Sequence, residues 1–383
     1  MILCHKLYKE VILRRRFVIY AILFSALLFV SLSHGAYDDG ARYMFTASAQ
    51  NRSIYIIDLH KRKHADTILI DFEPNMISAS DSLKALVVAS RDARRLILVD
   101  LSSDQLSQYS YPLSISPDYI NVSPIGDTIA IYDRDQQILE VHALKRRQVL
   151  LRADNVRSGD SFTFNLDGST IYWVDHEAGT LNSVDLWSKR KKLKLTSTKK
   201  GLSSLSRSID GLLGFVSSRL ENAVYVINLR DFTSLIKIRV GSNPGRPWGT
   251  TDGSYMLVPN QGDSTVSVIS ASSLQSIYTV STVNSPISIN SGWLDTTAAV
   301  LGAHGAIGFI DVIKGTAGKE YDLKNVPHEG IVTSDSKTLL IPVAGKGAIS
   351  FFDMRTRSLT SEISGLPKDI GAATLAVSNN LCH

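Results

Sequence analysis

The chain has 383 residues, with 41 Lys+Arg against 36 Asp+Glu and a formal net charge of +5. Most of this excess lies in residues 1–16, which carry five basic residues and one acidic residue, Glu10. Without them the balance is 36 to 35, a net charge of about +1. This near neutrality removes the electrostatic argument for nucleic-acid binding. We therefore expect no nucleic-acid partner.

Residues 1–35 have the organisation of a secretory signal peptide. A basic stretch precedes the uncharged run 17–33 (FVIYAILFSALLFVSLS), and Ser33 and Gly35 supply small residues at a cleavage site. The alternative is an N-terminal membrane anchor, although this run is slightly shorter than the ~20 residues of a spanning helix. In both cases we expect residues 36–383 to be exported, either periplasmic or secreted, or held at a membrane through residues 17–33. After cleavage only Cys382 remains, so we expect no internal disulfide.

The rest of the chain is repetitive. Eight times a short apolar run ends in a small acidic or polar residue, at intervals of 41 to 43 residues. This period is typical of a β-propeller blade, a four-stranded sheet that packs radially around an axis. The residues one and four positions earlier are apolar and mostly β-branched, as strands prefer. The end positions are Asp58, Asp100, His142, Asp185, Asn228, Ser270, Asp311 and Asp353.

Each of these runs is the expected third strand of a blade, and a second apolar strand precedes it. The second strands are expected at 43–48, 85–90, 128–133, 170–175, 212–217, 255–260, 297–302 and 338–343. Tight-turn signals such as Asp167-Gly168 and Asp210-Gly211 stand before most of them, because glycine accepts positive φ readily. The innermost strands should fall just before these turns, for example near 287–290 and 329–333.

The ends of the chain predict how the ring closes. No inner strand precedes Arg42, whereas residues 370–377 look like an inner strand with nothing after it. We therefore predict an all-β fold over residues 36–383. It is one eight-bladed β-propeller of four-stranded antiparallel blades, closed by the C-terminal strand pairing with the first blade. Glu140, Asn182 and Ser183 interrupt the apolar pattern, and we interpret them as weaker packing of half-exposed outer strands.

Residues 252–270 (DGSYMLVPNQGDSTVSVIS) resemble the repeat of the YVTN family, the YncE-like propellers. Residues 223–228 (AVYVIN) and 348–353 (AISFFD) repeat the second half of the motif, whereas Glu140 and Ser183 depart from it. The resemblance implies a fold rather than one activity. Similar eight-bladed rings include the haem-binding propeller domains of haem-d-type nitrite reductases. Seven-bladed cousins serve as dehydrogenase subunits, lactonases and exported binding proteins.

Sequence motifs for catalysis are missing. There is no G-x-S-x-G elbow, no phosphate-binding G-x-x-x-x-G-K-[ST] loop, no complete H-E-x-x-H and no C-x-x-C-H. We therefore predict no catalytic residues. His304 and His328 lack the clustered spacing of a metal site, so we predict no metal.

The loops around the axis are the remaining place for a site. One face should gather Arg246, Trp248, His304, His328 and Glu329. A guanidinium, an aromatic plate and histidines on one rim suit an anionic or planar ligand, so these five are our candidate cofactor- or ligand-binding residues. The alternative is that they are ordinary loop residues around a water-filled funnel. The identity of any cofactor is left open.

The opposite face should carry basic turns after the third strands of units one, three and four. This asymmetry suggests docking of an acidic partner or an anionic membrane surface, although solvated turn residues are the plain alternative. The basic residues are Lys61, Arg62, Lys63, Arg146, Arg147, Lys189, Arg190, Lys191 and Lys192.

Three functions follow in order of preference. The first is an exported, non-catalytic, monomeric propeller that serves as a binding platform for a protein or small molecule. The second is a redox-associated propeller that holds a haem-like or quinone-like group in its axial funnel. The third is a lactonase-like hydrolase, which is disfavoured because no metal-ligand set is visible.

Overall fold

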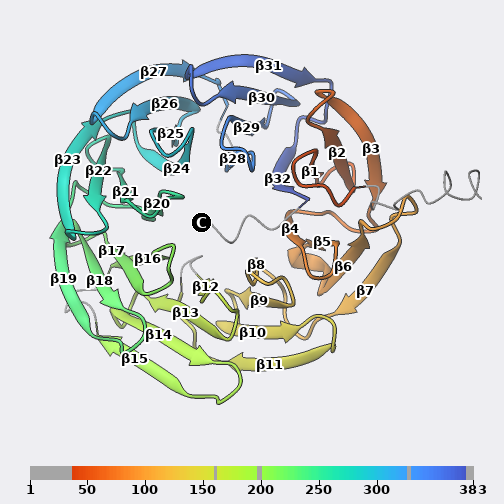
Figure 1. Cartoon of the computed structure of the whole chain (residues 1–383). Helices are drawn as coiled ribbons and strands as arrows, with labels where there is room; N and C mark the ends of the chain where they lie inside the picture. The colour runs from red at the N-terminus through yellow and green to blue at the C-terminus, as the bar shows by residue number, and fades with distance from the viewer. Residues whose placement is uncertain (1–36, 159–161, 196–200, 326–328, 377–383) are drawn as a thin grey trace, which may run out of the picture.

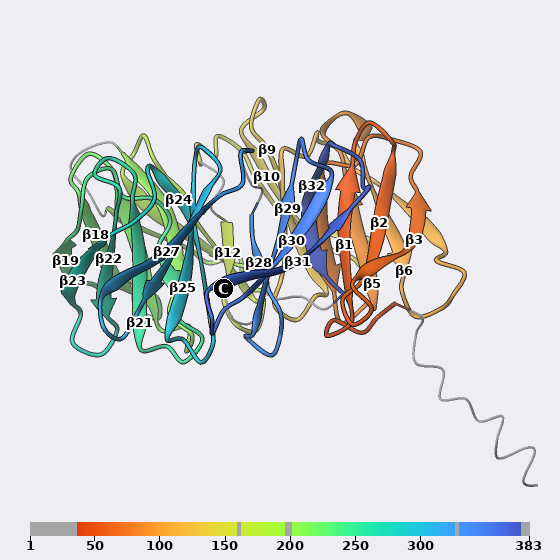
Figure 2. The same cartoon turned by 90° about the horizontal axis from the view of Figure 1, so that it is seen from above.

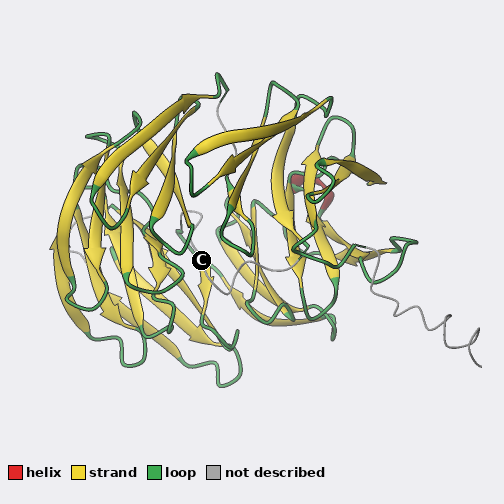
Figure 3. Ribbon diagram, turned by 45° about the horizontal axis from the view of Figure 1, so that its top comes forward, coloured by secondary structure: helices red, strands yellow, loops and turns green. Residues whose placement is uncertain are grey.

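The computed structural model describes residues 37–158, 162–195, 201–325 and 329–376. Its strands form eight four-stranded sheets around a central axis, as Figure 1 shows along that axis and Figures 2 and 3 show from other directions. Neighbouring strands in each sheet are antiparallel. The predicted eight-bladed β-propeller is confirmed.

Each blade contributes one strand at each of four distances from the axis. The inner strands are β4 (Met76–Ser80), β8 (Tyr119–Val122), β12 (Phe162–Phe164), β16 (Leu202–Arg207), β20 (Trp248–Gly249), β24 (Pro286–Gly292), β28 (Ile331–Val332) and β32 (Ile370–Leu375). The second strands are β1 (Tyr43–Ser48), β5 (Ala85–Ala89), β9 (Thr128–Asp133), β13 (Thr170–Asp175), β17 (Leu213–Ser218), β21 (Tyr255–Asn260), β25 (Thr297–Gly302) and β29 (Thr338–Val343). The third strands are β2 (Ser53–Asp58), β6 (Arg95–Asp100), β10 (Ile138–Ala143), β14 (Thr180–Asp185), β18 (Ala223–Asn228), β22 (Thr265–Ser270), β26 (Ala306–Asp311) and β30 (Ala348–Asp353). The outer strands are β3 (Lys63–Leu69), β7 (Gln108–Pro112), β11 (Gln148–Ala153), β15 (Lys191–Leu195), β19 (Ser234–Arg239), β23 (Gln275–Ser281), β27 (Thr316–Asp322) and β31 (Ser358–Ser364).

The first blade joins the two ends of the described chain. Its strand order is β3-β2-β1-β32, so the last strand supplies the inner strand that the N-terminal part lacks. Met44 pairs with Leu375, and the Asp369 carboxylate accepts hydrogen bonds from the Ser48 hydroxyl and the Gln50 N–H, both at 2.7 Å. The predicted closure is confirmed. Residue 377, which the predicted strand included, lies outside the described residues.

The turns between first and second strands share one geometry in five blades. The N–H of the residue that opens the turn donates to the carbonyl five positions later, as in Ser123 to Thr128 and Ser208 to Leu213. The residue three positions after the opening one has positive φ and is glycine in four of the five, for example Gly211 with φ 72°. The second strand starts two residues after it. The predicted strand 212–217 is therefore one residue early, because β17 starts at Leu213.

Blade three corrects another predicted position. Strand β10 ends at Ala143, which pairs with Thr128 at the start of β9, just as Asp58 pairs with Tyr43 in blade one. His142 was therefore the wrong end position, by one residue. The error arose because the repeat interval tolerates either choice and alanine has no polar side chain to mark the end. His142 instead takes the preceding position, which apolar residues occupy in the other blades, and is 3% exposed.

This histidine belongs to a buried polar network between blades two and three. Its Nδ1 lies 3.0 Å from the Tyr111 hydroxyl, and its Nε2 lies 2.9 Å from a carboxylate oxygen of Glu140. Ser114 and Arg152 donate to the other oxygen of Glu140. Burial by itself would raise the pKa of Glu140, but the hydrogen bonds from His142, Ser114 and Arg152 lower that pKa to about 2. Glu140 is 2% exposed, so its interpretation as a half-exposed residue in a weakly packed strand is wrong.

The hydrophobic core is divided among the spaces between neighbouring blades. One cluster, for example, joins Leu139 of blade three to Phe162 and Ile171 of blade four. Ser183 in blade four is also buried, contrary to the same interpretation, whereas Asn182 is partly exposed. Burial of apolar area between blades therefore holds the ring together.

The ring presents two faces, which we call the loop face and the turn face. The loop face carries the loops that lead into the inner strands, such as residues 242–247, together with the turns between second and third strands. The turn face carries the turns between first and second strands and those between third and outer strands. The described residues include no helix with the length and apolar character to span a bilayer.

Candidate functional site

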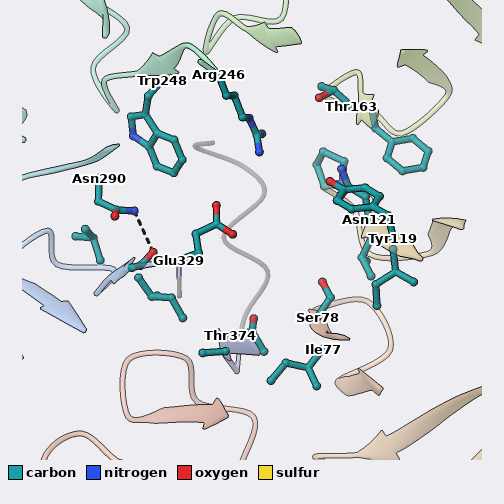
Figure 4. Close-up of a pocket in the computed structure, with 18 of the residues that line it drawn as sticks. Ile77, Ser78, Tyr119, Asn121, Thr163, Arg246, Trp248, Asn290, Glu329 and Thr374 are labelled. Carbon is teal, nitrogen blue, oxygen red and sulfur yellow. Dashed lines mark hydrogen bonds between the residues drawn. The ribbon is translucent and has the colours of Figure 1, made fainter. Parts of the chain in front are cut away.

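A cavity of about 260 Å³ lies on the axis, and all eight inner strands or the loops beside them line it (Figure 4). The strand register explains why. One residue of each inner strand pairs with the third residue of its second strand, and these eight residues form what we call the axial ring. They are Ser78, Asn121, Thr163, Ser206, Trp248, Asn290, Ile331 and Thr374. Six of the eight are polar, so the cavity is hydrophilic at this level.

Asn290 is the most constrained polar group of the axial ring. Its side chain is 2% exposed, and its Nδ2 donates to the Gly330 carbonyl at 3.0 Å. A flipped amide would place Oδ1 against the Gly330 carbonyl oxygen, and two acceptors cannot form a hydrogen bond. This bond therefore fixes which end of the amide is Oδ1. Oδ1 is buried and has no hydrogen-bond partner among the described residues. A buried acceptor without a donor is costly and calls for a partner that the protein itself does not supply.

Asn121 repeats this anchoring on the other side of the cavity. Its Nδ2 donates to the Phe162 carbonyl of the next blade at 2.6 Å. Asn121 belongs to blade three and Asn290 to blade seven, and Figure 4 shows them on opposite sides of the opening. Both amides are therefore held by neighbouring inner strands and do not depend on a ligand for their orientation.

Arg246 supplies positive charge at the rim on the loop face. Its backbone is fixed on both sides, because the Gly245 carbonyl accepts from the Ser217 hydroxyl and the Pro247 carbonyl from the Ser206 hydroxyl. Figure 4 shows the guanidinium directed into the cavity. Its Nε is buried and has no hydrogen-bond partner among the described residues. The loop thus holds a cation with donors left available.

Trp248 and Glu329 complete the same rim. Together with Arg246 they line the axial cavity and also an adjoining cavity of about 250 Å³. Trp248 is 9% exposed and packs in a cluster with Leu257, whereas Glu329 is exposed and its carboxylate faces the opening in Figure 4. Three of the five predicted site residues are therefore brought together.

The other predicted residues lie elsewhere. His304 is exposed in the turn between β25 and β26 and lines neither cavity, and His328 lies outside the described residues. Asp369, also near this face, is used by the closure of blade one. Within the described ranges, no group of three or more His, Cys, Asp or Glu side chains is arranged to hold a metal ion.

Sequence reasoning missed Asn121, Asn290 and Arg207, which also lines the cavity. The inner strands are short, and their residues vary too much to align by eye. A usable signal does exist in the five blades that share the turn between first and second strands. In these blades the axial-ring residue stands two positions before the residue that opens that turn. Counting back from Ser123 in this way finds Asn121, and counting back from Ser208 finds Ser206.

No protein-family model matches the chain, and no curated protein matches it. Among solved structures, it is similar to the dihydro-heme d1 dehydrogenase NirN in complex with DHE, with a TM-score of 0.72 and 15% identity over 90% of this chain and 77% of that one. It is also similar to apo AztD from Citrobacter koseri, with a TM-score of 0.63 and 15% identity over 88% of this chain and 97% of that one. A third similar structure is the hydrazine synthase of Kuenenia stuttgartiensis, with a TM-score of 0.51 and 17% identity over 66% of this chain and 87% of that one. At these identities the likeness shows the propeller fold alone.

Proposed function

We propose that the chain is an exported, YVTN-type propeller that acts as a non-catalytic binding platform, with a small ligand in its axial cavity. The observation that carries the proposal is the polar axial cavity, in whose wall the anchored Asn290 stands across from Asn121 and below Arg246. Such preorganised polar groups in a concave site are what small-ligand recognition requires. The region 252–270 and the signal-like residues 1–35 support the YVTN-type and exported parts of the proposal.

The cavity wall indicates the chemistry of the ligand. Arg246 offers donors to an anionic group such as a carboxylate, and the anchored amides of Asn121 and Asn290 add fixed polar groups to the wall. The hydroxyls of Ser78, Thr163 and Thr374 can either donate or accept. We therefore propose a small, polar, acid-bearing molecule with at least one hydrogen-bond donor.

The redox-associated alternative is supported by the similarity to NirN, which was solved in complex with DHE. Arg207 and Arg246 would suit the carboxylates of a haem-like group. Haem iron, however, is held by His, Cys, Met or Tyr, and among the described lining residues only Tyr119 is of these types. The described lining therefore fits a small polar ligand better than an axially ligated haem.

The test is to identify what the protein carries when it is purified from its native source. Denatured protein is analysed by mass spectrometry for released small molecules, and its visible spectrum is recorded beforehand. The variants are Arg246→Ala and Asn290→Leu, with Arg219→Ala as the control because Arg219 is exposed on the loop face in the turn between β17 and β18. We expect the parent and the control to release the same acid, and the two cavity variants to bind it about tenfold to a hundredfold more weakly.

Two results would contradict this proposal. If all four proteins retain one compound equally, the cavity is not its site. If the native protein shows strong visible absorbance that Asn290→Leu removes, the cavity holds a pigment and the redox alternative is correct.

A further inference from the structure

The turn face of blades three to five exposes five large apolar side chains. Ile125, Leu166 and Ile209 stand in consecutive turns between first and second strands, Leu212 follows the last of these, and Trp187 lies in the turn between β14 and β15. Their exposed fractions range from 39% to 59%, and Trp187 has the largest. Isolated surface aliphatics are ordinary, but five on one face of three neighbouring blades form a patch.

The three turn residues form a continuous row. A Cβ placed on Gly168 in blade four would lie 3.4 Å from Ile125 of blade three, and one on Gly211 in blade five would lie 3.1 Å from Leu166 of blade four. Each apolar side chain therefore leans over the turn of the next blade. A Leu186 N–H bond to the Ser169 carbonyl, 2.8 Å long, ties the turn that holds Trp187 to this row within blade four.

Basic residues surround the row on the same face. The turn after β10 holds exposed Lys145, Arg146 and Arg147, and the turn after β14 with the start of β15 holds exposed Lys189, Arg190, Lys191 and Lys192. Aspartates are present on the turn face too, but their carboxylates accept hydrogen bonds from backbone N–H groups of the turns beside them. Asp167 accepts from the Ser169 N–H, and Asp185 from the Trp187 and Ser188 N–H groups. Two of the basic groups are held in a similar way, because the Lys189 ammonium donates to the Leu150 and Leu186 carbonyls and the Lys192 ammonium to the Arg230 carbonyl.

The N-terminal end of the described chain also contacts the ring on the turn face. Tyr37 donates its N–H to the carbonyl of Leu101, which follows the third strand of blade two, and its hydroxyl to Asp66. Only three residues separate Tyr37 from the uncharged run 17–33. At no more than ~3.6 Å per residue, the end of that run stays within about 15 Å of the turn face. If residues 1–35 remain attached as an anchor, the membrane therefore meets the turn face and not the loop face.

We propose that the turn face of blades three to five docks on an anionic lipid surface. Exposed Lys and Arg are drawn to the negative potential of such a surface, and Trp and aliphatic side chains insert at the headgroup boundary. The turns project apolar and basic side chains together, which suits a fluid anionic surface better than a folded acidic protein. The attachment of residues 17–33 on the same face favours the bilayer as well. Arg246 and Glu329, which line the axial cavity on the loop face, then lie on the side away from the membrane.

The experiment measures sedimentation with vesicles of phosphatidylglycerol and phosphatidylcholine, and with vesicles of phosphatidylcholine alone. The protein begins at Ala36, since all eight sheets are formed within residues 43–375. The turn-face variant is R146E/R190E/K191E, and the matched control, R52E/R219E/K368E, changes the charge equally on the loop face. A third variant, Trp187→Ser, leaves the charge unchanged.

We expect the parent to bind the anionic vesicles, with tryptophan fluorescence that shifts to the blue and binding that weakens with salt. The turn-face variant should bind about a hundredfold more weakly, while the loop-face control binds like the parent. Trp187→Ser should lose the fluorescence shift. Equal loss in both charge variants, no binding by the parent, or parental binding to polyglutamate but not to vesicles would each overturn the proposal.

Discussion

A stop after Lys368 removes β32 and leaves β1 without its neighbour at the axis. The removed segment contains Ile370 and Leu375, both fully buried, and Asp369, whose carboxylate accepts hydrogen bonds from Ser48 and Gln50. We expect the truncated protein to lose cooperative unfolding and to aggregate. The uncovered edge of β1 would present unpaired backbone groups to other chains.

The size of the expected loss of stability follows from the burial of these side chains. Burying an aliphatic side chain contributes ~1.5–3 kcal/mol, so Ile370 and Leu375 together contribute about 3 to 6 kcal/mol. This is comparable with the whole ~5–15 kcal/mol stability of a typical protein. A milder change, Leu375→Ala, should cost about 2 to 5 kcal/mol and leave a folded protein with a lower melting temperature.

The assay is urea unfolding followed by circular dichroism and light scattering, with a stop after Ala376 as the control because that protein keeps β32. The Leu375→Ala variant supplies an intermediate point on the same scale. If the protein that ends at Lys368 melts with the parent's midpoint and cooperativity, the C-terminal strand does not close the ring, and the energetic reasoning fails with it.

Three further predictions concern single side chains. Glu140 has a folded-state pKa of about 2 against an ordinary 4.5, so its contribution to stability is fully present above pH 4.5 and is lost as the pH falls toward 2. Glu140→Gln should flatten the stability–pH curve in that window by up to about 3 kcal/mol. An unchanged slope in acid titrations would contradict the hydrogen-bond network around Glu140. Asp295 in blade seven accepts hydrogen bonds from the Thr251 and Asp252 N–H groups of blade six, so Asp295→Ala should cost about 2 kcal/mol in chemical denaturation, whereas a neutral effect would show that this link between blades is dispensable. Gly347 has φ 65°, and a Cβ there would lie 2.2 Å from a backbone oxygen, so Gly347→Ala should lower stability by about 2 kcal/mol; calorimetry showing no change in melting would refute this.

The repeat period was enough to predict the fold and its closure because every blade packs against its neighbours in the same way. Most positions that face the space between blades are apolar, and in five blades the turn before the second strand has a residue with positive φ. The prediction failed by one residue where these rules left a choice. In blade three the end position is alanine, so the nearby polar residue, His142, was taken in its place.

The candidate site was harder to predict from the sequence than the fold, for a physical reason. Arg246, Trp248 and Glu329 were found because they belong to loops that must converge on the axis in any propeller. Asn290 could not be recognised by residue type, because an asparagine within a strand is an exception to the apolar pattern. Its importance depends on the bond to Gly330, which only the packing of blade seven against blade eight creates.

The bond between Ser48 and Asp369 joins residues 321 positions apart, and it sets an order of events for the growing polypeptide. Strand β1 leaves the ribosome first, yet its neighbour arrives last, so the circle stays unfinished until translation is nearly complete. Contacts of such long sequence separation form slowly, and the incomplete chain exposes apolar surface meanwhile. A polypeptide built in this way keeps the inner edge of β1 without a strand neighbour until β32 has been made.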